Sequence, residues 1–472
     1  MPIQRVSYIP DDNSEDYQLH VNSGINFNNY DTIHVRVTGN DIPDSISSLD
    51  DFQIPDFLKT NMRSAEYRNL TPLQMHTIPI IDRGRDIMAC AQTGSGKTVA
   101  FLVPIIKNIV EMMDINPFNR NAPKCIVLVP TRELCRQIFT VAHRLCQGSS
   151  LRCGYAYGGI EMRTSMQKLY KSDILVCTPR RLLSHVEGNG FTLEKLRYFV
   201  LYEADRLLQN DSFLETVKTV YEKSKAAGVE SLHVSMFSAT FPAKMQYLGE
   251  SLLVNHLFVA VGLVGSTNTD IKQVVIRVTS EEKLNAALDY LTKNDTGKTL
   301  IFVRTKRFAD FLAIRLIDLK FNTTSIHGDR DQFLRESALN DFKSGRVTFL
   351  VATNVASRGL DILKVDTVIN VDMPEDMDVY VRRIGRTGWC GNTGLSVSFF
   401  DEDKDLSHAP RLIKILKDAE QECPSWLALL CSGYRPPDSK NRRDYRKGVQ
   451  SSTFIETGAG FMNNDENDDF FN

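Results

Sequence analysis

The feature that most limits the fold of this chain is a glycine-rich segment, AQTGSGKT at 91–98, between the short apolar run DIMAC and the longer run VAFLVPII. A strand, a glycine loop and the first turn of a helix, in that order, form a cradle for phosphate groups. Gly94 and Gly96 let backbone N–H groups turn inward without interference from a Cβ atom. The positive end of the following helix adds to the attraction for an anion. The segment therefore predicts a phosphate site at the end of a strand.

Two polar residues complete this loop. Lys97 is predicted to reach the β- and γ-phosphates of a nucleotide, and the hydroxyl of Thr98 is placed for Mg²⁺. The predicted nucleotide-binding residues of the loop are Thr93, Gly94, Ser95, Gly96, Lys97 and Thr98.

A second strand end supplies carboxylates. Sites of this type normally take two of them, one for Mg²⁺ and one for the attacking water. Here the apolar strand at 199–201 leads into the sequence YEAD, in which Glu203 is the predicted base and metal ligand, but Tyr202 stands where the metal carboxylate belongs. A phenol is neutral at pH 7. Because two unit charges ~5 Å apart at an effective dielectric of ~20 interact by roughly 3 kcal/mol, we expect hydrolysis to be slowed by about two decades, while nucleotide binding survives.

Short apolar runs, polar turns and longer amphipathic stretches recur along the chain, a pattern typical of strands and crossover helices in a parallel sheet. Two series of such strands predict two α/β domains in tandem. The expected strands are 125–130, 173–179, 197–202 and 233–240, then 298–305, 347–353, 365–372 and 395–400. The expected divisions are a polar N-terminal extension (1–47), domain 1 (48–262), a linker (263–275), domain 2 (276–436) and a tail that is basic and then acidic (437–472).

The charge balance excludes one class of partner recognition. Lys and Arg number 56 against 58 for Asp and Glu, so the chain does not grip nucleic acid by bulk charge. The opening residues MPIQRVSYIPDD hold neither an apolar signal core nor an Arg-rich leader, and no apolar run approaches the ~18 residues of a membrane span. We therefore expect a soluble, intracellular protein with no membrane partner.

The order of further motifs resembles that of the DEAD-box ATP-dependent RNA helicases, and most closely their Vasa subgroup. The resemblance covers roughly residues 8–435 and implies two tandem RecA-like domains, each a parallel sheet flanked by helices, which bind ATP, Mg²⁺ and RNA. The motifs that carry it are YRNLTPLQ (67–74), PTREL (130–134), TPRRL (178–182), SAT (238–240), HGDRDQFLRE (327–336), ATNVASRGLD (352–361) and YVRRIGRTG (380–388).

For the nucleotide, the resemblance implies that Gln74 bonds to the adenine edge and that Asp361 approaches the ribose. The aromatic residue that the family stacks on the base is Leu49 here, unless Phe52 takes over. Arg383 and Arg386 would reach across the cleft to the γ-phosphate as arginine fingers, completing a predicted catalytic set with Lys97 and Glu203.

For RNA, the resemblance implies contacts from backbone amides and hydroxyls as well as arginines. Arg180 stands where the family usually has glycine, so it either adds a phosphate contact or obstructs the strand. The implied RNA-binding residues are Pro130, Thr131, Arg132, Gly158, Gly159, Thr178, Pro179, Gln332, Arg335, Thr353, Arg358 and Gly359.

Three residues, Asp205, Ser238 and Thr240, are implied to couple the two ligands, because the hydroxyls of SAT bond to the carboxylates of YEAD in the family. Two further departures lie in the last motif. Arg382 replaces the usual His, and Trp389 replaces the usual Arg.

Two functions from different classes follow. The first is an ATP-dependent RNA helicase with hydrolysis slowed by Tyr202, and the second is a pseudo-helicase that acts as an RNA-binding clamp or scaffold. A DNA-acting motor is disfavoured by the RNA-facing motifs. The resemblance also implies a monomer in perinuclear ribonucleoprotein granules, with germ-granule proteins as partners.

Overall fold

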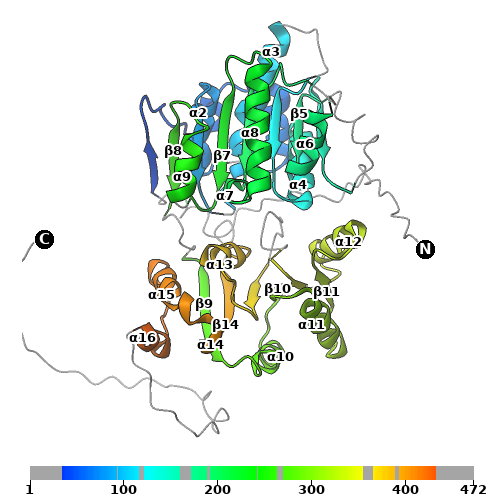
Figure 1. The fold of residues 1–472 in the computed structure, drawn as a ribbon, viewed down its shortest axis with the longest axis vertical. Helices are drawn as coiled ribbons and strands as arrows, with labels where there is room; N and C mark the ends of the chain where they lie inside the picture. The colour runs from blue at the N-terminus through cyan, green and yellow to red at the C-terminus, as the bar shows by residue number, and fades with distance from the viewer. Residues whose placement is uncertain are drawn as a thin grey trace, which may run out of the picture.

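The computed structural model describes residues 34–67, 69–92, 94–115, 122–159, 172–188, 192–241, 243–262, 269–354, 365–388 and 393–431. These residues form two lobes, each built on one sheet with helices on both faces (Figure 1). Each expected strand forms, so the prediction of two tandem α/β domains is confirmed. No helix among the described residues is both long and apolar enough to cross a bilayer.

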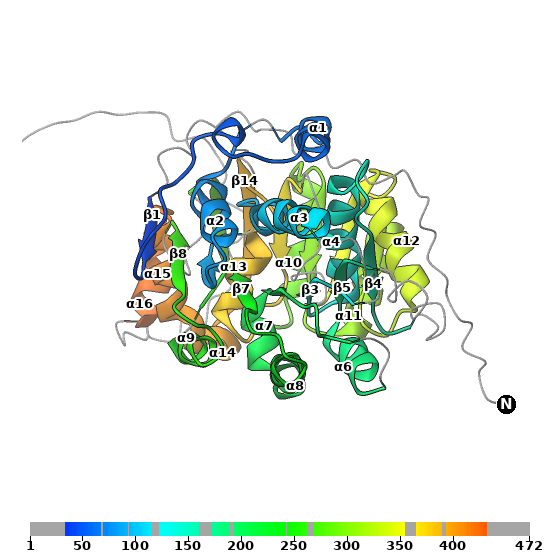
Figure 2. The same ribbon diagram turned by 90° about the horizontal axis from the view of Figure 1, so that it is seen from above.

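The sheet of the first lobe contains eight described strands in the order β1-β8-β2-β7-β6-β3-β5-β4, an order that can be followed from β1 to β4 in Figure 2. Its strands are β1 (Val35–Thr38), β2 (Ile87–Cys90), β3 (Cys125–Leu128), β4 (Cys153–Ala156), β5 (Ile174–Cys177), β6 (Tyr198–Tyr202), β7 (His233–Ser238) and β8 (Leu257–Val261). Its α-helices are α1 (Asp56–Ser64), α2 (Pro72–Asp82), α3 (Lys97–Ile115), α4 (Arg132–Leu145), α6 (Pro179–Glu187), α7 (Ala204–Gln209), α8 (Asp211–Ala226) and α9 (Ala243–Glu250).

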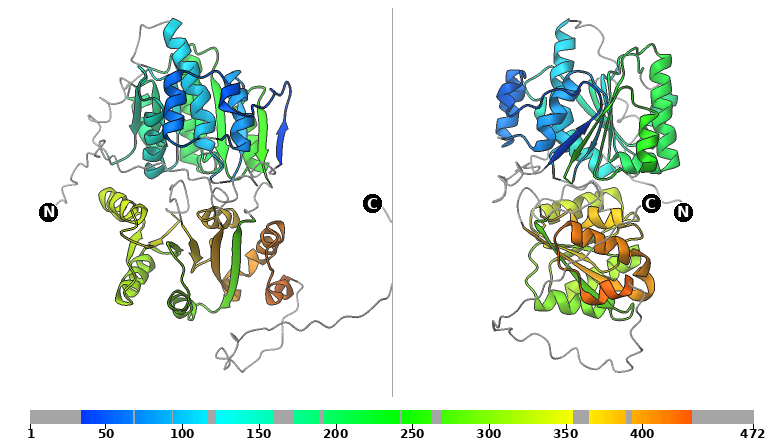
Figure 3. Two further views of the ribbon diagram at one scale, coloured as in Figure 1. Left: turned by 180° about the vertical axis from the view of Figure 1, so that it is seen from behind. Right: turned by 90° about the vertical axis from the view of Figure 1, so that its left-hand side faces the viewer.

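This sheet is buried on both faces, which explains why its strands are continuous apolar runs. Alternate residues of β2 show the division: Ile87 packs into the core beneath α1 to α4, and Met88 into the core beneath α6 to α9. The edge-on view in Figure 3 shows the helices on either side of the sheet.

The predicted N-terminal extension, 1–47, includes a strand of the first sheet, because residues 35–38 form β1. β1 pairs antiparallel with β8, with Val35 opposite Val261, and adds a strand to the sheet. Val35 and Val37 pack against the core in alternation, because an uncovered β8 would leave an apolar edge in water. The period-two pattern VRVT was the available signal in the sequence.

Asp86, just before β2, gives the first lobe a dependence on pH. Its buried carboxylate accepts the N–H groups of Val234 (2.8 Å) and Val254 (2.7 Å). Burial nevertheless raises the pKa of Asp86 to about 6, above the ordinary 3.8. The stability that this group contributes is therefore full below the unfolded pKa and is lost as pH rises through the folded one.

We expect the free energy of unfolding to fall by about 2–3 kcal/mol through Asp86 between the two pKa values. Asp86→Asn removes the titrating group, so its unfolding free energy should lack this part of the fall. Urea denaturation of both proteins across that pH range measures the difference. Parallel curves for the two proteins would contradict the assignment.

The second lobe has six described strands in the order β11-β12-β10-β13-β14-β9, and the printed pairings are all parallel. Its strands are β9 (Ile271–Val278), β10 (Thr299–Phe302), β11 (Thr323–Ile326), β12 (Phe349–Ala352), β13 (Thr367–Asn370) and β14 (Gly394–Asp401). Its α-helices are α10 (Lys283–Lys293), α11 (Lys306–Asp318), α12 (Gln332–Lys343), α13 (Met377–Ile384), α14 (Glu402–Asp405), α15 (Ala409–Asp418) and α16 (Ser425–Cys431).

The predicted linker, 263–275, is too long at its C-terminal end. β9 begins at Ile271 and pairs with β14 over its whole length, so 271–275 belong to the second sheet. The polar residues of β9 hid this strand, because Lys272 is exposed at an outer position of the sheet. Of the predicted extension and the predicted tail, residues 1–33 and 437–472 lie outside the described part.

Candidate functional site

The predicted motifs lie at one edge of the first sheet. The phosphate loop follows β2, SAT forms the end of β7, and YEAD begins at the end of β6, and these three strands are neighbours in the order β2-β7-β6. The RNA-facing motifs follow β3, β5 and β4, the next three strands. Ligands of open α/β sheets bind outside the carboxyl ends of the strands. The nucleotide and RNA motifs therefore occupy adjacent halves of one edge.

The phosphate loop is held from below by the start of α2. Thr71 caps this helix and its hydroxyl donates to the carbonyl of Ser95 at 2.7 Å. Gln74 completes the capping box by accepting from the N–H of Thr71 at 3.0 Å, and its amide donates to the carbonyl of Gly96 at 3.1 Å. The side chain of Gln74 thus helps to hold the phosphate loop against the start of α2. Its hydrogen bond to adenine stays a prediction.

Lys97 lies folded into the loop. Its ammonium donates to the carbonyls of Ala91 (2.7 Å) and Gln92 (3.2 Å), and its side chain is buried. Burial lowers the pKa of Lys97, an effect that the charge of Glu203 opposes. Gly94 and Gly96 have φ of +86° and +80°, values that favour glycine, as the motif predicts.

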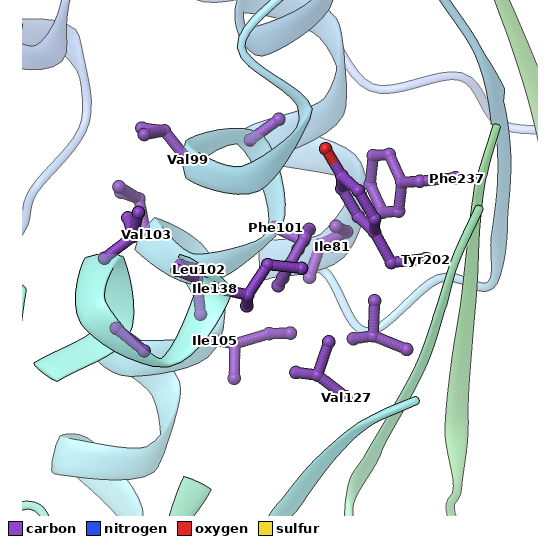
Figure 4. Packing of buried hydrophobic residues seen from close by; sticks show 14 of the residues in the cluster. Ile81, Val99, Phe101, Leu102, Val103, Ile105, Val127, Ile138, Tyr202 and Phe237 are labelled. Atoms are coloured by element: carbon purple, nitrogen blue, oxygen red, sulfur yellow. The ribbon is translucent and has the colours of Figure 1, made fainter. Parts of the chain in front are cut away.

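Tyr202 belongs to the core and to the site at once. Its ring packs edge-on against Phe101, with ring centres 5.9 Å apart, and Figure 4 shows it beside Phe237 as well. Its hydroxyl accepts a hydrogen bond from the hydroxyl of Thr98 at 3.4 Å. The phenol therefore occupies the position beside Thr98 that a metal carboxylate is expected to fill.

Glu203 caps α7 with a backbone in the left-handed region, at φ 56° and ψ 51°. Such a conformation in a residue other than glycine is a form of strain that concentrates at functional sites. The structure also brings together two of the predicted coupling residues, since the hydroxyl of Thr240 donates to Asp205 at 3.2 Å. Ser238 accepts the N–H of Thr240 at 3.3 Å and so shapes the same turn.

The second lobe reaches this site through α13. The guanidinium of Arg382 forms an ion pair with Asp205 and donates to the hydroxyl of Thr240 at 3.3 Å. Both charged side chains are almost completely buried, at 3% and 2% exposed. The departure from histidine at position 382 therefore creates a buried ion pair that joins the two lobes.

The side chain of Arg383 contacts residues of its own second lobe, and its role as an arginine finger stays a prediction. Its guanidinium donates to Asn354 (2.6 Å), Asn370 (3.2 Å) and the carbonyl of Asp372 (2.7 Å), and it lies over the ring of Phe302. These partners belong to the second lobe, so Arg383 holds the ends of β12 and β13 together in this structure.

Arg386 is buried in the second lobe. Burial is the main cause that lowers the pKa of Lys97, and the positive charge of Arg386 acts in the same direction. The role of Arg386 as an arginine finger stays a prediction.

Helix α4 of the first lobe and helix α12 of the second lobe lie on the facing sides of the two lobes (Figure 1), and the predicted RNA-facing arginines Arg132 and Arg335 come from these two helices. Arg132 donates to Gln332 at 3.4 Å, and Arg335 forms an ion pair with Glu133. Burial and the charge of Arg335 lower the pKa of Arg132, because two guanidinium groups lie close together. The structure therefore gathers cations from both lobes at one place.

Sequence reasoning missed one further contact here. Arg136 forms an ion pair with Glu336 at 3.0 Å, and Tyr157 donates to the same carboxylate at 3.4 Å. The signal available was the placement of Arg136 one turn after Arg132 on the same helix.

The predicted glycine pair, Gly158 and Gly159, leaves room for the guanidinium of Arg132. A Cβ atom on Gly159 would lie 2.9 Å from the guanidinium, and Gly159 has a φ of +100°.

Other predicted RNA-binding residues lie at helix starts. The side chain of Thr131 caps α4, and Thr178 precedes α6 without a side-chain cap hydrogen bond. Pro130 precedes Thr131, and Pro179 is the first residue of α6. Thr353 follows β12 and is buried, and Arg180 is exposed at the first turn of α6. The predictions for Thr93, Arg358, Gly359, Asp361 and Trp389 lie outside the described residues.

A phosphate loop in one lobe, faced by arginines from a helix of a second lobe, defines the class of two-lobed RecA-like nucleotide-binding proteins. Residues 71–248 match the DEAD/DEAH box helicase family, and residues 282–391 match the helicase conserved C-terminal domain. The chain belongs to the DEAD/DEAH box helicase family.

Its relatives include Vasa-type proteins. The ATP-dependent RNA helicase DDX4 of Mus musculus is 43% identical over 472 residues, which cover 96% of this chain and 67% of that protein. The ATP-dependent RNA helicase vasa of Drosophila melanogaster is 42% identical over 435 residues, 91% of this chain and 65% of that protein. The chain thus spans about two thirds of the length of such relatives, as it does for the Pelophylax lessonae protein at 66%.

Solved structures agree with the fold. The DEAD-box helicase Mss116 bound to ssRNA and UDP-BeF has a TM-score of 0.72 and 27% identity, with 84% of each chain covered. Dbp5 of S. cerevisiae, bound to RNA and ADP BeF3, has a TM-score of 0.70 at 23% identity and covers 82% of this chain and 98% of that chain, which shows the fold alone. The expected RecA-like domains are therefore confirmed.

Proposed function

We propose that this chain is an ATP-dependent RNA helicase that binds ATP and RNA between its lobes and locally unwinds or remodels RNA. The observation that carries the proposal is the contact of α13 with the ends of β6 and β7, where Arg382 meets Asp205 and Thr240. Through this contact, a ligand that closes the lobes at the nucleotide half also assembles the RNA half of the same edge. The Mss116 structure, which holds RNA and a nucleotide analogue, supports both ligands.

The proposed cycle follows from this geometry. ATP and RNA each favour the closed arrangement, so each raises the affinity for the other. Arg132 and Arg335, from opposite lobes, are close together only when the lobes are closed, and they are proposed to hold the RNA backbone there. Closure bends one strand of a short duplex and releases its partner, and phosphate loss reopens the cleft.

The Mg²⁺ that the family resemblance implies fits this donor set poorly. Thr98 faces the phenol of Tyr202, and Asp205 is paired with Arg382. Of the predicted ligands, Glu203 alone supplies a charge, so the chemistry proposed here uses the groups of the chain itself.

Hydrolysis is proposed to be slow for the same reason. Glu203 remains to orient the water, while Lys97 and Arg386 remain to meet the phosphates. A pseudo-helicase that closes on RNA without turnover is the alternative that Tyr202 favours.

One experiment tests the proposed function. We expect RNA oligonucleotides, but not DNA oligonucleotides, to stimulate phosphate release and duplex unwinding by the full chain, and we expect Lys97→Ala to abolish both. Equal stimulation by DNA would support a DNA motor instead. If the wild type is no more active than Lys97→Ala, the helicase proposal fails and the alternative, an RNA-binding clamp without turnover, stands.

A second test concerns the RNA half. We expect Arg335→Ala to weaken RNA binding about tenfold and to lower the slope of log affinity against log salt by about one, because one phosphate contact is lost. Fluorescence anisotropy with a labelled oligoribonucleotide over a salt series measures both quantities. Arg346→Ala on the same segment is the control, since its side chain is 73% exposed and pairs with Asp341. An unchanged salt slope in Arg335→Ala would argue against a phosphate contact.

The cellular setting is proposed from the relatives. The chain is proposed to be a cytoplasmic monomer that acts in ribonucleoprotein or germ granules and contacts other granule proteins, and the similarity to the Vasa-type RNA helicases motivates the granule part of this proposal. Light scattering of the purified chain tests the monomer, and imaging of a tagged chain tests the granules.

A further inference from the structure

Two oxygen-bearing groups at the expected metal position, the hydroxyl of Thr98 and the carboxylate of Asp205, are engaged within this chain. The hydroxyl of Thr98 donates to the hydroxyl of Tyr202 at 3.4 Å. The carboxylate of Asp205 is paired with Arg382 and accepts from Thr240 at 3.2 Å. Mg²⁺ in nucleotide sites is normally held by one or two carboxylates together with the phosphates. Here the phenol is uncharged and the ion pair neutralises one of the two remaining carboxylates.

The charges at the site point the same way. The buried cations Lys97, Arg382 and Arg386 and the buried carboxylates Glu203 and Asp205 together carry an excess of one positive charge. The nearby carboxylate of Asp378 is paired with Arg411. With a carboxylate at position 202 and a neutral histidine at position 382, the same positions would carry an excess of one negative charge. A divalent ion would then change that excess to one positive charge. Tyr202 and Arg382 therefore give this site a net charge of plus one without a divalent ion. A site with a carboxylate at 202 and a histidine at 382 reaches the same net charge only when the ion is bound.

We propose that this site binds adenine nucleotide free of divalent cation, with the guanidinium of Arg382 and the phenol of Tyr202 replacing the ion and its carboxylate. The proposal rests on the proposed nucleotide binding and adds the form of the ligand. The nucleotide phosphates gain their counter-charge from Lys97 and Arg386, which approach from opposite lobes. Nucleotide binding is therefore insensitive to the removal of Mg²⁺.

Calorimetric titration of the full chain with a non-hydrolysable ATP analogue, in excess Mg²⁺ and in EDTA, tests this proposal. We expect the wild-type Kd to change by less than about threefold between the two buffers. In Tyr202→Asp, which restores a carboxylate, EDTA should weaken binding by about tenfold or more, because two carboxylates then repel the phosphates without an ion. Tyr202→Asn removes the ring without adding charge, and should keep the wild-type response.

A second measurement follows the metal itself. Electron paramagnetic resonance of Mn²⁺ with protein and analogue should show no protein-bound ion in the wild type and a bound ion in Tyr202→Asp. Wild-type binding that needs Mg²⁺, or a bound Mn²⁺ signal in the wild type, overturns the proposal. Absence of nucleotide binding in both buffers overturns the proposed function as well, so the two failures are distinct.

Discussion

Replacing Tyr202 with aspartate is expected to raise RNA-stimulated phosphate release about a hundredfold over the wild type. The phenol oxygen lies beside the hydroxyl of Thr98, which is where this class of site places a charged ligand. A restored carboxylate supplies the missing interaction of roughly 3 kcal/mol if that interaction acts only in the transition state. Phosphate release at saturating RNA and ATP, with Mg²⁺ present, measures the change.

Tyr202→Asn is the matched control, because asparagine has the size of aspartate and no charge. We expect no gain in this variant, and thermal melting of both variants separates a loss of folding from a loss of chemistry. A Tyr202→Asp protein that folds and is no faster than Tyr202→Asn would refute the role assigned to the charge. If only Tyr202→Asp exceeds the inactive Lys97→Ala, the natural chain is a clamp rather than a helicase.

Replacing Arg382 with alanine is expected to open the two lobes. The change leaves the carboxylate of Asp205 buried without its partner, which typically costs 3–5 kcal/mol and corresponds to a fall of about a hundredfold or more in the closed population. Energy transfer between dyes placed on the two lobes measures closure without nucleotide. RNA affinity should fall in parallel, because the cations of α4 and α12 separate.

Two further variants sharpen this test. Arg346→Ala removes an exposed arginine of the same lobe and should leave energy transfer unchanged. The double variant Arg382→Ala/Asp205→Ala removes both charges, so it should recover part of the closure that the single variant loses. Equal energy transfer in the wild type and Arg382→Ala would show that the ion pair does not hold the lobes.

The central strands were predictable because a strand buried on both faces must be an apolar run, as in CIVL of β3 and TLIF of β10. The expected strands do not include β1, β4, β8, β9 and β11, of which β4 and β8 are mostly buried and the others are more polar. β9 and β11 carry exposed or partly exposed residues, and β1 is defined by pairing to a distant strand. Such strands depend on tertiary contacts that local patterns do not encode.

The site was predictable as a set of positions and less so as a set of contacts. The family resemblance implied the hydrogen bond of Thr240 to Asp205, which the structure has. It gave Arg132 and Gln332 only as members of one RNA-binding set, and the contact between them was not predicted. The partners of Arg383 were not predictable, because Asn354, Asn370 and Asp372 come from other elements of the second lobe. The pairing of Arg382 with Asp205 joins residues that are far apart in sequence, and no spacing rule links them.

The aromatic packing of Tyr202 has a consequence for the history of this chain. Its ring fills space against Phe101 and Phe237, so a return to a small acidic side chain would first empty part of the core. Loss of a large buried side chain typically costs about 3–5 kcal/mol, a large share of the 5–15 kcal/mol that stabilises most proteins. A protein with a small acidic residue at position 202 and a partly empty core would be selected against, so the change from tyrosine is hard to reverse. Descendants of this chain should therefore keep an aromatic residue at this position even where their neighbouring motifs drift.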